Sequence, residues 1–311
     1  MFSVPRRSRL LPESVGLALG HLGAVRDGDD ETIHVARVEI RRAREIAAVA
    51  ATASDGDAAA IDEPLKKVSR ALGRARDADV VYRLVLDLSV RFRGAPQMTT
   101  SLLSRAGESR DRMRRKLVKK LERMEPDKVL RPALSAGRRW FGGDSARAWR
   151  AALRRHLADR ADRLRHSIDE AGGIDFPERL HRARIATRRL RLSLEFADGA
   201  SVARPPGARR LLKQAQTALG HLHDLDVLIQ TIRRLVAMHP PLALEADMLL
   251  QFVRSERARY HAAYIDCRDD LLRLCDQCQA LGTWHVGRRA ALAAATVALP
   301  TAALLVVRHR A

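Results

Sequence analysis

The sequence predicts an all-α protein made of two four-helix bundles, related by a pseudo-two-fold axis, with a basic groove at the centre. Apolar residues recur at helical spacing along most of the chain, as at Leu11, Val15, Leu19 and Leu22. No window shows the sustained alternation of apolar and polar residues that is typical of a half-buried strand. Three blocks of sequence occur twice at one constant offset of 147 residues, which indicates an internal duplication.

Short breaks rich in Gly, Pro, Ser and Asp divide each repeat into four expected helices. In the first repeat, about residues 10–124, they run over about 10–26, 31–53, 64–92 and 97–124. In the second repeat, about residues 144–280, they run over about 145–171, 177–197, 207–238 and 242–278. Residues 125–143 are the expected linker, because they contain two prolines and three glycines. The helical domain is thus expected over 10–282, followed by a C-terminal apolar tail over 283–311.

A histidine followed by spaced arginines occurs in both repeats, as HVARVEIRRAR over 34–44 and HRARIATRRLR over 181–191. At about 100° per residue, the histidine and three arginines of the first copy lie within about 80° of one another on a helix. Like charges at helical spacing repel, so such a face indicates an anionic ligand, and guanidinium groups suit phosphate. The candidate phosphate-binding residues of this block are His34, Arg37, Arg41, Arg42, Arg44, His181, Arg184, Arg188, Arg189 and Arg191.

A second repeated block reads LGRARDADV over 72–80 and LGHLHDLDV over 219–227. The two aspartates of each copy are two positions apart, about 200° around a helix, so they do not point at one ligand. We therefore interpret Asp77, Asp79, Asp224 and Asp226 as structural residues that orient arginines or cap backbone groups. The same offset adds further candidate phosphate-binding residues in pairs: Lys66 with Lys213, Arg76 with His223, Arg110 with Arg257, and Arg112 with Arg259.

The net charge narrows the class of ligand. Lys and Arg number 57 against 37 Asp and Glu, which gives a formal charge of +20. Such a field attracts polyanions, among them nucleic acid, anionic membrane surfaces and phosphates. Aromatic residues make up only 4% of the chain, so few rings are present on which bases would stack. The composition therefore favours a backbone-like polyanion as the ligand rather than the bases of a nucleic acid.

Two groups of residues resemble metal sites, and we expect neither to bind metal. The string His221-Leu222-His223-Asp224 has arginines at the equivalent positions of the first copy, and arginine is not a metal ligand there. Cys267, Cys275, Cys278 and His285 form a nominal zinc set in which only the Cys275–Cys278 spacing is usual. We expect packing thiols instead, with no metal and no cofactor.

The cysteines and the two ends of the chain indicate the cellular compartment in which we expect the protein. An odd, clustered set of cysteines fits a reducing cytosol, and residues 1–20 show no apolar run of the signal-peptide type. Residues 290–307 form an uncharged run at the lower length limit for crossing a bilayer, but they are rich in alanine and contain Pro300. We expect a cytoplasmic protein whose tail packs on the bundle or stays loose, with a membrane anchor as the alternative.

Together the repeated blocks resemble the CHAD domain, the conserved histidine α-helical domain, over about residues 10–280. That family pairs a histidine and spaced arginines with an LGxxRDxDV-like motif in a duplicated unit. The resemblance implies a basic central channel that binds inorganic polyphosphate, and association with polyphosphate granules or sometimes polyester storage granules. His223 departs from the motif, because arginine is usual there. Many members are fused to a triphosphate tunnel domain marked by ExExK, and no such motif occurs in this sequence.

These observations predict a non-catalytic polyphosphate-binding module. Two alternatives remain open. One is a metal-dependent phosphohydrolase that acts on polyphosphate or triphosphate and uses the four repeated aspartates, since metal-assisted phosphate chemistry needs clustered carboxylates. The other is a nucleic-acid-binding protein, which the charge favours and the scarcity of aromatic residues disfavours.

Overall fold

The computed structural model describes residues 6–25, 30–53, 58–141, 146–203 and 205–282. Within these ranges the chain is helical with short connections and contains no strand, so the all-α prediction is confirmed. The first five helices are α1 (Arg6–Ala24), α2 (Asp30–Ala53), α3 (Ala58–Arg91), α4 (Pro96–Met124) and α5 (Pro126–Phe141). Next come α6 (Ala146–Glu170), α7 (Pro177–Gly199), α8 (Ala208–Met238), the short 3₁₀ helix η3 (Pro240–Leu242), α9 (Ala243–Ile265) and a last helix over 268–282.

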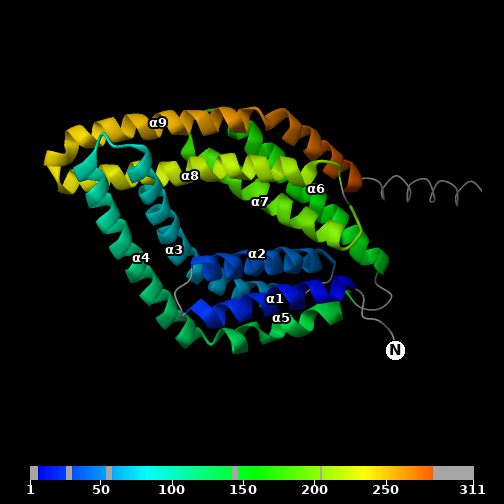
Figure 1. Cartoon of the computed structure of the whole chain (residues 1–311). Helices are drawn as coiled ribbons and strands as arrows, with labels where there is room; N and C mark the ends of the chain where they lie inside the picture. Colours follow the sequence, from blue (N-terminus) through cyan, green and yellow to red (C-terminus); the bar gives the residue numbers. More distant parts are fainter. Residues whose placement is uncertain (1–5, 26–29, 54–57, 142–145, 204, 283–311) are drawn as a thin grey trace, which may run out of the picture.

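The helices form two lobes joined at one end (Figure 1). One lobe contains α1, α2 and α5, and the other contains α6 to α9. Helices α3 and α4 leave the first lobe and reach the far tip of the second, where α3 contacts α8 and α4 contacts α9. Helix α2 contacts α6 and α7, so the two lobes also meet along their facing sides.

The segment expected to be a linker, residues 125–143, is instead mostly helix α5, so that prediction is wrong. Pro126 occupies the first helical position, where the missing N–H costs nothing. Leu130, Ala133 and Ala136 recur at helical spacing and are fully buried in the core, and α5 packs along α1. Burial of this apolar face outweighs the local preference of proline and glycine for irregular structure.

Two expected helix boundaries also differ. Helix α3 begins at Ala58 rather than Pro64, and Pro64 lies within its second turn. The expected helix over 242–278 is two helices, because α9 ends at Ile265 and a turn at 266–267 precedes the helix over 268–282.

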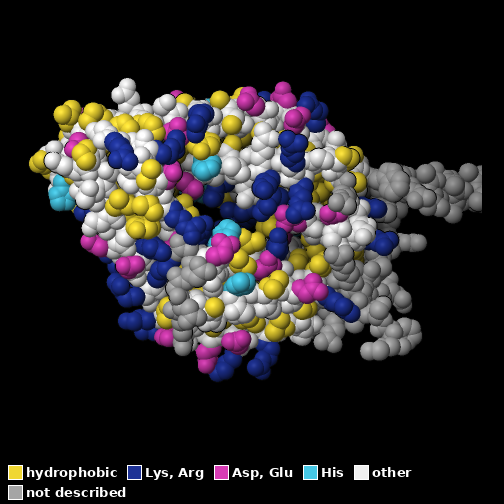
Figure 2. Space-filling model, viewed as in Figure 1, with side chains coloured by type: hydrophobic (Ala, Val, Ile, Leu, Met, Phe, Trp, Pro, Cys, Tyr) yellow, Lys and Arg dark blue, Asp and Glu magenta, His cyan; other side chains and the backbone are white. Residues whose placement is uncertain are grey.

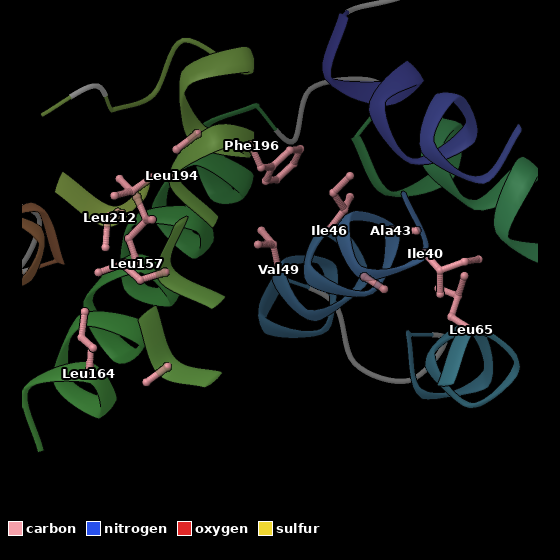
Figure 3. Packing of buried hydrophobic residues seen from close by; sticks show 14 of the residues in the cluster. Ile40, Ala43, Ile46, Val49, Leu65, Leu157, Leu164, Leu194, Phe196 and Leu212 are labelled. Atoms are coloured by element: carbon pink, nitrogen blue, oxygen red, sulfur yellow. The ribbon is translucent and has the colours of Figure 1, made fainter. Parts of the chain in front are cut away.

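The core does not follow the boundary between the repeats. The larger apolar cluster joins α2 to α7, with Ile46 and Val49 on one side and Leu194 and Phe196 on the other (Figure 3). The smaller cluster, at the tip, combines α3 and α4 with α8 and α9. Both clusters draw on both repeats, so we expect the chain to unfold as one unit. None of the described helices has the length and hydrophobicity needed to cross a bilayer, and residues 290–307 lie outside the described ranges.

Candidate functional site

Contact between α2 and α7 brings the two repeated cationic faces together. Arg41 on α2 and Arg188 on α7, at equivalent positions of the repeats, line the same two adjoining cavities of about 420 and 530 Å³. Figure 2 shows this part of the molecule as a hollow at the middle of one face, with Lys and Arg side chains gathered along it. We call the two adjoining cavities the central groove.

Five of the described helices supply the charged walls of the central groove, and α3 contributes Asp62, which pairs with Arg44 in the second cavity. In the first cavity, α2 and α7 contribute the side chains that carry the repeat, while α8 adds Lys213, His221 and Asp224. In the second cavity, α6 adds Arg160 and Arg163. The remaining basic groups of the two cavities are His34, Arg41, Arg44, Arg188, Arg189 and Arg191.

The arginines of the central groove repel one another. Partial burial, followed by the charge of Arg188, lowers the pKa of Arg41. Partial burial also lowers the pKa of Arg188, and the charges of Arg184 and Arg37 add to the effect. Repulsion of this kind destabilises the unliganded protein and is relieved when an anion binds among the charges.

The histidines of the repeat are neutral hydrogen-bonding groups at neutral pH. His181 Nδ1 and His223 Nδ1 lie 3.1 Å apart, so one ring donates its N–H to the other. Burial, followed by the charge of Arg184, lowers the pKa of His223 to about 4. Burial, followed by the charge of Arg76, lowers the pKa of His34. A bound anion would favour the protonated forms of these rings.

Three of the four repeated aspartates hold arginines. Asp79 is fully buried and accepts hydrogen bonds from Arg110 Nε at 3.3 Å and Arg114 Nε at 3.1 Å. Asp226 accepts from Arg257 Nε at 2.6 Å, which repeats the Arg110–Asp79 pair at the same offset. Asp77, on an exposed position, accepts from Arg37 Nη1 at 3.0 Å.

Asp224 differs from the other three aspartates because it lines the central groove. Burial, reinforced by the charge of Asp77 and partly opposed by that of Arg184, raises its pKa to about 6. It is the one aspartate of the repeated motif that lines a cavity of the groove, among the described residues.

Comparison with known proteins identifies the architecture. The family model of the CHAD domain matches residues 10–233, which is more than half of the chain. The chain belongs to the CHAD domain family. No curated protein matches the sequence.

Two solved structures resemble this CHAD domain. One is the crystal structure of the CHAD domain from the plant Ricinus communis, with a TM-score of 0.66 and 22% identity over 87% of this chain and 93% of that chain. The other is PptA from Streptomyces chartreusis, with a TM-score of 0.66 and 16% identity over 84% of this chain and 97% of that chain. At these identities the likeness shows the shared fold.

Several candidate residues of this CHAD domain lie away from the central groove. Lys66 pairs with Glu63, Arg110 and Arg257 pair with aspartates, and Arg112 and Arg259 are exposed on other surfaces. Arg42 pairs with Glu39 and Glu195 and lines a different cavity. The repeat therefore marks both arginines that line the central groove and arginines that pair with carboxylates elsewhere.

Other candidates lie beside the groove without lining its two cavities. Arg37 and Arg184 are close enough to Arg41 to lower its pKa, and Arg76 has the same effect on His34. The His181–His223 pair lies close to Arg184, whose charge lowers the pKa of both rings.

Arg160 and Arg163 line the groove of this CHAD domain and were not expected from the sequence. They lie on α6, where the equivalent residues of the first repeat are Glu13 and Gly16. The repeat therefore carries no signal for them. Their three-residue spacing on an Arg-rich helix is the only sequence feature that marks them.

The cysteines are buried, reduced and remote from the groove. Burial raises the pKa of Cys275 to about 12 and that of Cys278 to about 11. In the described part of the chain, no three His, Cys, Asp or Glu side chains come together as a metal site requires. His285 lies outside that part.

Proposed function

We propose that this CHAD domain binds inorganic polyphosphate in the central groove and does not catalyse a reaction on it. The observation that carries the proposal is the meeting of Arg41 and Arg188, which line the same cavities, so that the charge of Arg188 lowers the pKa of Arg41. A chain of phosphates placed between them replaces this repulsion with charge-assisted hydrogen bonds.

The length of the groove suits a linear ligand rather than a single phosphate. Arg191 and Lys213 lie in the first cavity, and Arg44 and Arg189 lie in the second, with Arg41 and Arg188 common to both. Guanidinium groups bind phosphate oxygens through paired N–H donors, while Lys213 adds a point charge. Successive phosphate units therefore meet successive cations along the groove.

The test is a titration with long-chain polyphosphate over a range of salt concentrations. Arg41→Ala with Arg188→Ala should lower the affinity by about tenfold or more, and the wild-type affinity should fall steeply with salt as counterions are released. The matched control is Arg112→Ala with Arg259→Ala, a pair that shares the 147-residue offset and the charge change but lies outside the groove. Equal losses in the two double variants would show binding by general charge and overturn the groove assignment.

Hydrolysis is the second candidate, and the donor set disfavours it. Asp79, Asp226 and Asp77 already accept hydrogen bonds from arginines, so a divalent metal would have to displace guanidinium groups to reach them. A phosphate-release assay on polyphosphate and triphosphate with Mg²⁺ or Mn²⁺ should give no turnover above the blank. Turnover that disappears in Asp224→Asn would establish catalysis instead.

Nucleic acid is the third candidate ligand, because its phosphates carry the charge that would bind the cationic groove. Duplex DNA or RNA, added at matched phosphate concentration and physiological salt, should not displace bound polyphosphate, because the chain offers few aromatic platforms for bases. Displacement of polyphosphate would show that nucleic acid is the preferred ligand.

Association with polyphosphate granules follows as part of the proposal. A fluorescent fusion should form foci that become diffuse when cellular polyphosphate is depleted. A signal that stays at the membrane after depletion would point to residues 290–307 instead.

A further inference from the structure

The cationic surface extends beyond the central groove on one side. A third cavity of about 340 Å³ lies between α6 and α7, and it shares Arg160, Arg163 and Arg189 with the second cavity of the groove. Arg182 and His166 also line it. A ligand that leaves the central groove past Arg163 and Arg189 thus enters a further basic surface without crossing a barrier of protein.

The acidic groups of this third cavity do not neutralise it. Arg163 pairs with Asp159, and Arg182 pairs with Glu170 at 2.7 Å, but their side chains are 60% and 51% exposed. Exposed ion pairs contribute little and exchange readily with other partners. Asp162 also lines the cavity and carries a formal negative charge. Arg160 is held by the buried Glu45, so the exposed Arg163, Arg182 and Arg189 face this lining carboxylate and leave a net positive charge that favours phosphate.

The opposite end of the groove has a different character. There a cavity of about 1000 Å³ adjoins the first cavity at Arg191 and Lys213. Its walls include the apolar side chains of Leu10, Leu17 and Ile46. They also include the carboxylates of Glu13, Glu39, Glu195 and Asp198.

Two of the five described cations that line this cavity, Arg42 and Arg191, pair with its carboxylates. Glu195 lies 3.3 Å from both Arg42 and Arg191, and Arg42 also pairs with Glu39. Arg209 and Arg210 are exposed and line the same cavity. A phosphate chain extended this way meets apolar walls and four carboxylates, which opposes binding.

The sequence explains why the two ends differ. At the 147-residue offset, the first-repeat residues equivalent to Arg160, Arg163 and Arg182 are Glu13, Gly16 and Val35. The central arginines are duplicated, and so is Arg189 of the third cavity, whereas Arg160, Arg163 and Arg182 occur in the second repeat alone.

We propose that polyphosphate bound in the central groove leaves it over α6 and α7, along Arg163, Arg189 and Arg182, and not at the α1 end. This inference rests on the proposed function and adds a direction and a preference for long chains. A short chain fills the central groove, and only a longer chain reaches the third cavity and gains further contacts.

The test compares long-chain polyphosphate with tripolyphosphate in two variants. Arg182→Glu changes a residue that lines the third cavity and neither cavity of the central groove. It should lower the affinity for the long chain by about tenfold and that for tripolyphosphate far less. The control, Arg209→Gln with Arg210→Gln, removes the same charge from exposed positions at the opposite end and should change the ratio of the two affinities by less than about twofold.

The remaining outcomes separate the inference from the proposed function. An unchanged affinity ratio in Arg182→Glu, or a larger effect in the control, overturns the one-sided exit. If polyphosphate binding in that experiment still depends on Arg41 and Arg188, only the exit is wrong. If the wild type binds neither ligand, the proposed function itself fails. Retained tripolyphosphate binding shows that each variant is folded.

Discussion

The backbone N–H of Met98 donates a hydrogen bond to Glu245 Oε2 at 2.8 Å, and these two residues are 147 positions apart. Positions that the repeat makes equivalent therefore touch, as expected beside a pseudo-two-fold axis. The bond has a local role as well. Ala95, which precedes α4, provides no side-chain cap, and Met98 is the third residue of that helix. Glu245, from the first turn of α9, supplies the acceptor that an N-cap side chain usually provides.

Replacement of Glu245 should therefore destabilise the tip where the repeats join. We expect Glu245→Ala to lower the free energy of unfolding by about 1 kcal/mol, as loss of an N-cap does. Glu245→Gln keeps an oxygen acceptor and should lose less. Urea unfolding followed by circular dichroism measures both. Equal stability of the wild type and Glu245→Ala would show that the bond contributes nothing.

Glu45 should contribute far more to stability, because it is buried between the lobes. Its carboxylate accepts hydrogen bonds from Arg160 Nε at 2.5 Å and Ser193 Oγ at 3.0 Å, and it lies 3.0 Å from His156 Nε2. Glu45→Ala leaves the buried Arg160 without its partner, which should lower the free energy of unfolding by about 3–5 kcal/mol. Glu63→Ala, at an exposed pair, should change the free energy of unfolding far less in the same experiment.

The same carboxylate predicts a loss of stability in acid. Burial raises the pKa of Glu45, but the hydrogen bond with His156 and the charge of Arg160 outweigh it, so the pKa is lowered. A lowered pKa gives stability that is present above the unfolded-state pKa and is lost as pH falls through the folded-state pKa. The wild type should therefore lose more stability between pH 5 and pH 3 than Glu45→Ala does. Parallel pH profiles for the two proteins would contradict this.

The fold class and the α2–α7 face were predictable because each rests on local spacing. The offset of 147 residues placed Arg41 and Arg188 at equivalent positions, and contact between their helices brings them together. Helix α5 was missed because its stability comes from packing against α1, and its prolines and glycines suggest the opposite.

The functions of individual arginines were less predictable than the helices. Arg41 and Arg110 are both repeated at the same offset, but Arg41 lines the groove and Arg110 bonds to Asp79. An arginine that occurs in both repeats has a similar structural environment in each. This does not show whether it binds a ligand or forms an internal ion pair. Arg163 shows the converse, because it lines the groove without being repeated.

The thiols should be unreactive in the folded protein. Burial raises the pKa of Cys275 and Cys278, and the thiolate is the reactive form. We expect little reaction of these two with a thiol reagent at pH 8 in native buffer, and reaction of all three cysteines in denaturant. Fast native labelling of Cys275 or Cys278, located by mass spectrometry, would show that this part of the core opens readily.

Because the arginines of the groove repel one another, removal of one should stabilise the unliganded protein and weaken polyphosphate binding. Arg41→Met keeps an apolar stem of similar length and removes a half-buried charge beside Arg188. The variant should gain on the order of 1 kcal/mol in stability without ligand, as replacement of uncompensated buried charges often does. Melting temperatures with and without polyphosphate measure both effects. The ligand should raise the melting temperature of the wild type more than that of Arg41→Met. A variant that is less stable without ligand would show that Arg41 is compensated in the free protein.

Asp224 predicts that binding strengthens in mild acid. Its pKa is raised to about 6 by burial, so it is ionised at pH 7.5 and places a negative charge in the groove. Protonation below pH 6 removes that charge, and a bound polyanion raises the pKa further. Affinity for long-chain polyphosphate should therefore rise by about tenfold between pH 7.5 and pH 5.5.

The substitution Asp224→Asn separates this carboxyl from the other titrating groups that face it. His34 and His221 line the same cavity, and burial lowers the pKa of both, while the pKa of His223 is about 4. Burial thus opposes protonation of these rings in the free protein, whereas Asp224 titrates within the window. The Asn variant should bind more tightly at pH 7.5 and show a flatter pH profile. If its profile keeps the wild-type slope, the rings rather than the carboxyl take up the proton when polyphosphate binds.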